Sequence, residues 1–317
     1  MKKFNLSEIN NSLTEFDLFI CSSSFEDRCL EVASRVNVEQ FKKIIICHFE
    51  DNYDESNKNL ERLGDIFKSH TVVVLSKNDP LLNYDKIYDE IIGLNFNNAL
   101  LDISTFTREM FLIILQLFNQ KPFQDKSLKL CYIPSDKYSS LSEDTPEHTW
   151  LSKGVQNIRA VLGYSGDFSP IKNLMLIVLT GFEAERAQII IDNFEPDVLY
   201  IGKASASNSA NEKLGKINEH NFDKILKTCL NANQFEFSCI EIDFTVDVLC
   251  KIIEQSKDKY NIVISPLNNK LSTLAVASVI SKHPEVQICY ASTNLYNIKA
   301  YSIPSDYLYM IDAKELR

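Results

Sequence analysis

Residues 102–110 (DISTFTREM) combine the side chains needed to hold a small anion at the start of a helix. An acid ends one apolar run, hydroxyl residues follow it, and a cation opens the next apolar run. Backbone N–H groups at a helix N-terminus attract anions, and hydroxyl and guanidinium groups add direct donors. The candidate ligand-binding residues here are Asp102, Ser104, Thr105, Thr107 and Arg108. The alternative is that Ser104 or Thr105 only caps the helix while Arg108 faces solvent.

A second turn of the same kind lies in the other half of the chain, at residues 265–270 (SPLNNK). It also follows an apolar run and precedes another. The candidate ligand-binding residues are Ser265, Asn268, Asn269 and Lys270. The alternative is ordinary turn chemistry, because asparagine side chains readily hydrogen-bond the nearby backbone.

Two further polar turns resemble each other and begin the two halves of the chain. They are residues 22–28 (SSSFEDR) and 180–186 (TGFEAER), whose Phe-Glu pairs lie 157 positions apart. We expect these turns to contact the ligand as well, and their Glu and Arg residues either form ion pairs at the site or act as first-turn helix charges. The candidate ligand-binding residues are Ser22, Ser23, Glu26, Arg28, Thr180, Glu183 and Arg186.

Sequence motifs of well-known catalytic and cofactor sites are absent. The chain has no G-x-G-x-x-G, P-loop, H-E-x-x-H or G-x-S-x-G sequence, and its five histidines are far apart in the sequence. Only 8 glycines occur in 317 residues, which disfavours glycine-rich phosphate loops. We therefore expect no resident cofactor and no metal, and the sequence names no catalytic residue.

The elements that must position these turns alternate along the chain. Short β-rich runs at 16–21, 43–48, 71–75, 99–103 and 128–133 are separated by amphipathic stretches, and the pattern restarts at 174–179. In the second half we expect strands at 198–201, 239–243, 261–265 and 286–291. Strands alternating with helices predict an α/β fold with mainly parallel sheets. The repeated turns favour two tandem Rossmann-like domains that arose by internal duplication; the alternative is one large α/β sheet.

The change in composition after residue 138 sets the expected domain limits. We predict an N-terminal Rossmann-like domain at 1–138 and a linker at 139–170, rich in Ser, Asp, Gly, Pro and Thr, with a short helix around 155–162. A C-terminal Rossmann-like domain at 171–317 follows, whose tail adds antiparallel edge strands. A pseudo-twofold relation would let the Arg108 and Lys270 turns serve one ligand.

Charge and apolar content limit the classes of partner. The formal net charge of −10 disfavours nonspecific binding to duplex DNA, which needs clustered Lys and Arg. No apolar run is long enough to span a membrane, and the first residues lack the apolar core of a signal peptide. Eight scattered cysteines without a C-x-x-C pair are typical of reduced thiols, so we expect a cytoplasmic protein.

Residues 102–110 fit the pattern D-x-[ST]-x-x-T-[KR]-x-M, which resembles the ligand-binding turn of CARF (CRISPR-associated Rossmann fold) domains. Thr105 and Phe106 stand where that family has two glycines, and Arg108 stands where it has lysine. Residues 265–270 resemble the same turn, one residue shorter, and keep the lysine. The resemblance implies a sensor of small nucleotide messengers, such as cyclic oligoadenylates, in a bacterial or archaeal antiviral defence system, with a separate effector protein as a candidate partner.

Residues 16–28 are also similar to the first segment of TIR domains, whose enzymes cleave NAD with a glutamate on a helix. Glu90 is the one candidate for that role. We therefore keep three functional hypotheses. The first is a sensor that binds a small anionic nucleotide at the carboxyl ends of two pseudo-symmetric sheets. The second is an enzyme that cleaves a nucleotide, either a TIR-like NAD glycohydrolase or a ring-nuclease-like phosphodiesterase. The third is a protein–protein module of a multi-subunit defence complex.

Overall fold

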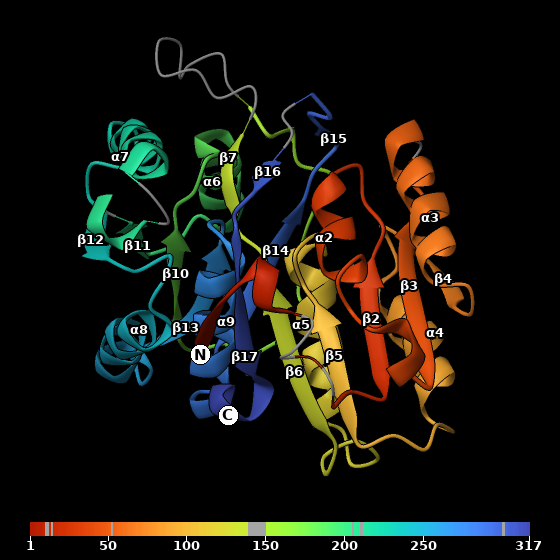
Figure 1. The fold of residues 1–317 in the computed structure, drawn as a ribbon. Coiled ribbons are helices and arrows are strands. Elements are labelled where there is room, and N and C mark those ends of the chain that lie inside the picture. The colour runs from red at the N-terminus through yellow and green to blue at the C-terminus, as the bar shows by residue number, and fades with distance from the viewer. Residues whose placement is uncertain are drawn as a thin grey trace. The chain divides into compact units, whose positions relative to one another are not determined.

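The computed structural model describes residues 1–9, 13, 15–51, 53–138, 150–204, 206–209, 212–299 and 302–317. The chain divides into two compact units, each with its own sheet and its own helices (Figure 1). Unit 1 comprises Met1–Tyr138 and Tyr301–Glu315, and unit 2 comprises Ser139–Ala300 and Leu316–Arg317.

Unit 1 is built on a sheet with the strand order β1-β17-β6-β5-β2-β3-β4. The five strands from β6 to β4 are parallel, while β17 is antiparallel to β6 and β1 is antiparallel to β17. The central strands are continuous apolar runs because helices cover both faces of the sheet. The strands are β1 (Lys2–Asn5), β2 (Leu18–Ser22), β3 (Lys43–Phe49), β4 (Thr71–Leu75), β5 (Asn98–Asp102), β6 (Ser127–Tyr132) and β17 (Tyr307–Asp312).

Helices cover the two faces of this sheet in pairs. One face buries Phe19, Ile44 and Ile46 against α2 and α3, and α4 packs beside α5. Helix α3, which carries apolar residues on only one side, was not expected from the sequence. The helices are η1 (Leu6–Glu8), η2 (Asp27–Cys29), α2 (Leu30–Ala33), η3 (Val38–Gln40), α3 (Asp54–Ile66), α4 (Pro80–Ile91) and α5 (Arg108–Asn119), with η6 (Ala313–Leu316) at the end of the chain.

Unit 2 repeats this plan with the strand order β12-β11-β10-β13-β14-β9. All its neighbouring strands are parallel except β9, which is antiparallel to β14. The strands are β9 (Asn157–Ala160), β10 (Asn173–Leu179), β11 (Val198–Lys203), β12 (Asn233–Glu236), β13 (Tyr260–Pro266) and β14 (Gln287–Ser292). The helices are α6 (Ala184–Phe194), η5 (Ala206–Asn208), α7 (Glu212–Leu226), α8 (Ile242–Ser256) and α9 (Lys270–Lys282).

Both units share one topology. If the parallel strands of each unit are numbered along the chain, their order in the sheet is 3-2-1-4-5, and an antiparallel strand lies beside the fifth. This is the order of the Rossmann fold, in which the chain reverses direction across the sheet between strands 1 and 4. The expected α/β class, with two Rossmann-like and mainly parallel sheets, is therefore confirmed. The shared order is also what a duplicated sequence predicts.

The two halves of the chain exchange their last strands. Strand β9 follows the fifth strand of unit 1 in sequence but pairs with β14 of unit 2, and β17 follows unit 2 but pairs with β6 of unit 1. A short strand precedes each exchanged strand and pairs beyond the end of the fifth strand of the same unit. These small sheets are β16 (Ser302–Pro304) with β7 (Ser135–Tyr138) in unit 1, and β8 (Ser152–Lys153) with β15 (Leu295–Tyr296) in unit 2.

The exchange makes the structure differ from the expected domain limits. The tail expected to complete a domain at 171–317 supplies β16 and β17 to unit 1. Of the expected linker, 139–149 lies outside the described residues, and the rest contains β8 and β9 rather than a short helix at 155–162. Left-handed glycines on either side, Gly154 (φ 66°) and Gly163 (φ 83°), interrupt helical geometry there, and the edge of β14 offers β9 hydrogen-bond partners.

A second difference concerns residues 239–243, which were expected to form a strand. The third strand of unit 2 is instead β12, whose pairing ends at Glu236 opposite Lys203. The hydroxyl of Ser238 then accepts hydrogen bonds from the N–H groups of Ile240 and Glu241, which turns the chain into α8. The alternating apolar residues 240 and 242 lie at the start of a helix, where periodicity over so few residues does not distinguish helix from strand.

Candidate ligand-binding site

The strand order brings the four polar turns together in pairs. Strands 1 and 4 are neighbours in both sheets, β2 beside β5 and β10 beside β13. The turns 22–28 and 102–108 therefore leave the sheet of unit 1 at adjacent points, and the turns 180–186 and 265–270 do the same in unit 2. In open α/β sheets this switch point at the carboxyl ends of the strands is where ligands bind.

In unit 1 the buried polar groups of the turn 102–108 form hydrogen bonds that fix the conformation of this turn. Oδ1 of Asp102 accepts a hydrogen bond from the N–H of Ser104 at 2.9 Å, and Oγ of Ser104 accepts one from the N–H of Ile133 at 2.9 Å. Helix α5 is capped by Thr107, whose Oγ1 accepts a hydrogen bond from the N–H of Met110 at 3.1 Å. The expected alternative cap, Ser104 or Thr105, is therefore not the one used. Arg108 is half-buried at the first position of α5.

A hydrogen bond links the two turns of unit 1 directly. Oγ1 of Thr105 donates to the carbonyl oxygen of Ser22 at 3.0 Å. The next residue, Phe106, is buried in the core with 2% of its surface exposed. Phe106 is thus a core residue, although it occupies a position where the CARF pattern has glycine.

Glu26 and Arg28 form a buried ion pair in the first turn of unit 1. Arg28 Nη2 and Glu26 Oε2 are 2.7 Å apart, and the side chains are 6% and 16% exposed. Nη1 of Arg28 donates to the carbonyl oxygen of Ile133, and the hydroxyl of Ser302 on β16 donates to Glu26 Oε2 at 2.6 Å. Burial alone would lower the pKa of Arg28, but the Glu26 carboxylate reverses that effect and raises it. The guanidinium is thus charged and already paired.

Unit 2 contains the same three types of side chain, again with an ion pair between glutamate and arginine and a serine that donates to the glutamate. Arg186 Nη2 and Glu183 Oε2 are 2.8 Å apart, with side chains 8% and 14% exposed. The hydroxyl of Ser152 on β8 donates to Glu183 and accepts a hydrogen bond from Arg186. We call Ser302–Glu26–Arg28 and Ser152–Glu183–Arg186 the two Ser–Glu–Arg clusters. Of the two alternatives for these Glu and Arg residues, ion pairs or first-turn helix charges, the structure shows the ion pairs. The serines were missed because they lie far away in the sequence.

The two turns of unit 2 are also joined by a side-chain hydrogen bond. Nδ2 of Asn268 donates to the carbonyl oxygen of Thr180 at 2.6 Å, as Thr105 does to Ser22 in unit 1. Asn269 caps α9 by accepting from the N–H of Ser272 at 2.9 Å. Ser265 is fully buried at the end of β13, and Lys270 is half-buried at the first position of α9.

The backbones of these two turns also touch. A Cβ atom placed on Gly181 would lie 2.2 Å from the carbonyl oxygen of Leu267, so only glycine fits at this crossing. The turn after strand 1 and the turn after strand 4 are thus in contact in unit 2, as the strand order requires.

The basic residues of the site fall into two groups. Arg28 and Arg186 are neutralised by their glutamates, whereas Arg108 and Lys270 each begin a helix of at least twelve residues at a carboxyl edge. Burial raises the pKa of Tyr138 on β7, and the charges of Arg28 and Arg108 act against that rise. Tyr138 therefore lies within electrostatic reach of both arginines. No sequence pattern marks this tyrosine, because β7 follows the expected last strand of its half.

Two other residues occupy positions that matter for chemistry. Ser23, the residue after β2, lies with its Oγ 2.8 Å from Nδ1 of His48 on β3. Glu90 on α4 forms an ion pair of 2.9 Å with Lys43, the first residue of β3. Lys43 marks the amino end of that strand, so Glu90 lies at the edge of the sheet opposite to Ser22 and Arg108.

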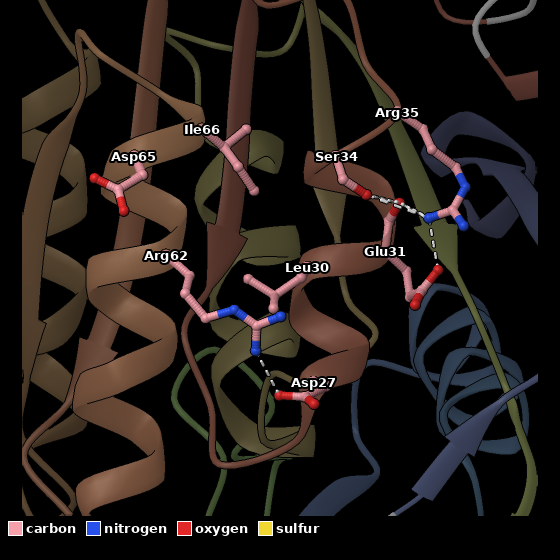
Figure 2. Close-up of a pocket in the computed structure, with 8 residues that line it drawn as sticks. All are labelled: Asp27, Leu30, Glu31, Ser34, Arg35, Arg62, Asp65 and Ile66. Atoms are coloured by element: carbon pink, nitrogen blue, oxygen red, sulfur yellow. Dashed lines mark hydrogen bonds and ion pairs between the residues drawn. The ribbon is translucent and has the colours of Figure 1, made fainter.

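A surface groove of about 480 Å³ lies elsewhere in unit 1, between η2–α2 and α3 (Figure 2). Arg62 reaches from α3 to Asp27 at 3.0 Å, and Arg35 pairs with Glu31 at 2.6 Å (Figure 2). None of the candidate ligand-binding residues lines this groove. Its charges are paired side by side on open surface, so it offers no concentrated charge to a ligand. The lining residues are Asp27, Leu30, Glu31, Ser34, Arg35, Arg62, Asp65 and Ile66.

Within the described part of the chain, no group of three or more His, Cys, Asp or Glu side chains is arranged to hold a metal ion. In the same residues, no helix combines the length and apolar character needed to cross a membrane.

Comparisons with known proteins leave the chain without a family. No protein-family model and no curated protein matches it. Among solved structures, a tRNA methyltransferase of B. subtilis, TrmK, is similar over 45% of this chain and 62% of its own, with 10% sequence identity and a TM-score of 0.25. The match thus spans less than two thirds of the methyltransferase chain.

Proposed function

We propose that this protein is a sensor that binds a small anionic nucleotide at the carboxyl edges of its two sheets, in the manner of CARF domains. One observation carries the proposal. The strand order pairs the four polar turns at two switch points, and a side-chain hydrogen bond joins each pair, Thr105 to Ser22 and Asn268 to Thr180. These are the places where open α/β sheets bind ligands.

Charge and helix geometry support an anionic ligand. Arg108 and Lys270 begin α5 and α9, where the helix N-terminus adds partial positive charge and N–H donors. The other two arginines of the site are already paired with glutamate. Each edge therefore combines the N-terminus of a long helix with a basic side chain at its first position, which suits a phosphate group of a small ligand.

The class of ligand and the biological setting rest on the CARF resemblance of residues 102–110 and 265–270. That resemblance favours a nucleotide messenger over inorganic phosphate and suggests a role in prokaryotic antiviral defence, with a separate effector protein as the partner. The TIR-like alternative loses support, because Glu90 pairs with Lys43 at the amino edge of the sheet instead of lying at the carboxyl edge.

Native mass spectrometry and calorimetry test the proposal. The full chain, purified without denaturation, is weighed for bound small molecules and then titrated with cyclic oligoadenylates and with nucleoside mono- and triphosphates. We expect a bound or titratable nucleotide whose binding is lost in the Arg108→Ala/Lys270→Ala double variant. If no nucleotide co-purifies and none binds, the sensor function is wrong, and the protein–protein module becomes the leading hypothesis.

A further inference from the structure

Ser23 and Thr180 occupy equivalent places in the two units. Each follows the first parallel strand, and each donates its backbone N–H to a carbonyl oxygen of the second strand. These bonds join Ser23 to Cys47 at 3.0 Å and Thr180 to Gly202 at 3.2 Å. The duplicated fold therefore provides two versions of one turn, built from the same backbone contacts.

The two hydroxyl groups point to different partners. Oγ1 of Thr180 donates to the same carbonyl oxygen of Gly202 at 2.6 Å, which closes the turn on itself. Oγ of Ser23 is 3.5 Å from the corresponding carbonyl of Cys47 and only 2.8 Å from Nδ1 of His48. Unit 2 shows that the fold can satisfy this hydroxyl with backbone alone. The contact with histidine in unit 1 is thus an addition that the turn itself does not require.

His48 is held so that its second nitrogen is left for another partner. Its side chain is buried to 8% exposure at the end of β3, and Ser23 is 4% exposed. When Ser23 donates to Nδ1, the ring proton must reside on Nε2. Among the described residues, no hydrogen bond or ion pair involves Nε2 of His48. A hydroxyl within 2.6–3.2 Å of an imidazole nitrogen is the arrangement of an activated serine nucleophile.

Neighbouring hydrogen bonds fix the serine on both sides. The carbonyl oxygen of Ser22 accepts from Thr105, and that of Ser24 accepts from Nδ2 of Asn59 at 2.9 Å. Thr105 belongs to the turn that leads into α5, so Ser23 lies beside the switch point of unit 1. A rigid backbone around a nucleophile lowers the cost of orienting it for attack.

We propose that Ser23 and His48 form a nucleophile–base pair that cleaves a phosphoric ester at the carboxyl edge of unit 1. Oγ of Ser23 bonds to phosphorus while its proton moves to Nδ1 of His48, and the P–O bond to the leaving group breaks. The leaving alkoxide takes that proton, and water then releases the phosphoryl group from Ser23. The choice of a phosphoric ester rests on the proposed nucleotide-binding function; the reactive pair itself rests on the Ser23–His48 contact.

A fluorophosphonate probe tests the pair without knowledge of the natural ligand. Attack by Ser23 forms an Oγ–P bond and expels fluoride, so the full chain gains the mass of one phosphonyl group on a peptide that contains residue 23. We expect Ser23→Ala to abolish this adduct and His48→Asn, which keeps an acceptor for the hydroxyl, to slow its formation by about 100-fold or more. Ser34→Ala, which removes an exposed serine of the separate groove in Figure 2, should label at the wild-type rate.

Three results would overturn the proposal: no adduct on Ser23 in the wild-type chain, an adduct that persists in Ser23→Ala, or equal labelling rates in His48→Asn and wild type. Thermal melting of each variant shows that a lost adduct does not come from unfolding. Labelling needs no nucleotide. A chain that labels at Ser23 but binds no nucleotide would therefore keep the reactive pair and lose the sensor function.

Discussion

Four of the candidate ligand-binding residues are basic, and they differ in their ion pairing. The sequence identifies Arg28, Arg108, Arg186 and Lys270 as candidates, since each follows a strand-like run and a polar turn. It does not show which of them form buried ion pairs with glutamate. That distinction depends on Ser302 and Ser152, which reach the glutamates only because their strands pair with distant parts of the chain.

The ligand-facing role makes a prediction for single substitutions. Arg108→Ala and Lys270→Ala should each weaken nucleotide binding by about 1.5–3 kcal/mol, the range for a hydrogen bond to a charged group, which is roughly 10- to 150-fold in Kd. Calorimetric titration measures this loss. Arg62→Ala, a cation with 56% exposure in the groove of Figure 2, serves as the control and should leave Kd unchanged. Equal affinity in all three variants would exclude both edges as the binding site.

Buried thiols predict how stability depends on pH. Burial raises the pKa of Cys29, Cys239 and Cys289 to about 12, and it also raises the pKa of Cys21, Cys47 and Cys131. An unfolded thiol ionises near pH 8.5. Below that pH both states are protonated and nothing is lost; above it only the unfolded state ionises, so the free energy of unfolding falls as pH rises.

The contribution of one thiol can be measured by difference. Above about pH 9.5 the slope should approach 1.4 kcal/mol per pH unit for each thiol. Urea unfolding of wild type and Cys289→Ala at pH 7.5, 9.0 and 10.0 should show a shallower decline in the variant. Parallel declines would mean that Cys289 ionises in the folded state.

At the scale of elements, the two small sheets, β16 with β7 and β8 with β15, link each exchanged strand to the turn that follows the first parallel strand of a unit. Ser302 on β16 and Ser152 on β8 each donate to the glutamate of a buried Ser–Glu–Arg cluster. The cluster thereby connects a turn at the candidate site to the segment that precedes an exchanged strand. No sequence pattern marks β8, which is two residues long, as a strand.

Breaking one cluster should cost stability, because the arginine would remain buried without its counter-charge. We expect Glu26→Gln to lower the free energy of unfolding by about 3–5 kcal/mol, the cost of leaving a buried ion unpaired. Asp27→Asn, the neighbouring change in an ion pair with side chains 56% and 72% exposed, is the matched control and should cost under about 1 kcal/mol. Urea unfolding compares the two. Similar losses in the free energy of unfolding would show that the buried cluster contributes no more to stability than an exposed ion pair.

Sequence periodicity predicted most elements and failed where partners decide the structure. The strand and helix order of each parallel sheet follows from apolar runs separated by amphipathic stretches, and the switch-point position of the four turns follows from that order. Residues 239–241 form a turn that leads into α8 at Ile242, because the hydroxyl of Ser238 accepts hydrogen bonds from the N–H groups of Ile240 and Glu241. Residues 157–160 form a strand because β14 offers them an edge. The second of these partners lies more than 120 residues away and cannot be read from the local sequence.

At the scale of the molecule, the exchange of β9 and β17 means that the two similar halves of the sequence do not coincide with the two folded units. Each half of the sequence supplies five parallel strands to one sheet and one antiparallel strand, β9 or β17, to the other. The domain limits expected at 171–317 assume that each domain is one continuous stretch of the chain. A strand exchange breaks that assumption. The chain therefore passes between the units more than once, rather than through one linker.

Truncation tests the exchange. A chain that ends at residue 299 lacks β16 and β17, so hydrogen exchange should accelerate in β6 and in β1, whose partner is β17. Strands β10 and β13 of unit 2 should keep their protection, because their partners are present. Mass spectrometry of exchanged peptides measures both. Loss of protection in β14 with β6 unchanged would place the missing strands in unit 2 and contradict the exchange.

The exchange also decides when unit 1 can finish folding during synthesis. Strand β6 is complete once residue 132 has been made, but its neighbour β17 ends at residue 312. At about 5–20 residues per second, the ribosome needs on the order of ten to forty seconds to cover that interval. Throughout that time the edge of β6 is an open template for foreign strands. The unit that is translated first is thus the last to complete its sheet. A nascent chain released early would expose the edge of β6, at which such chains could pair and aggregate.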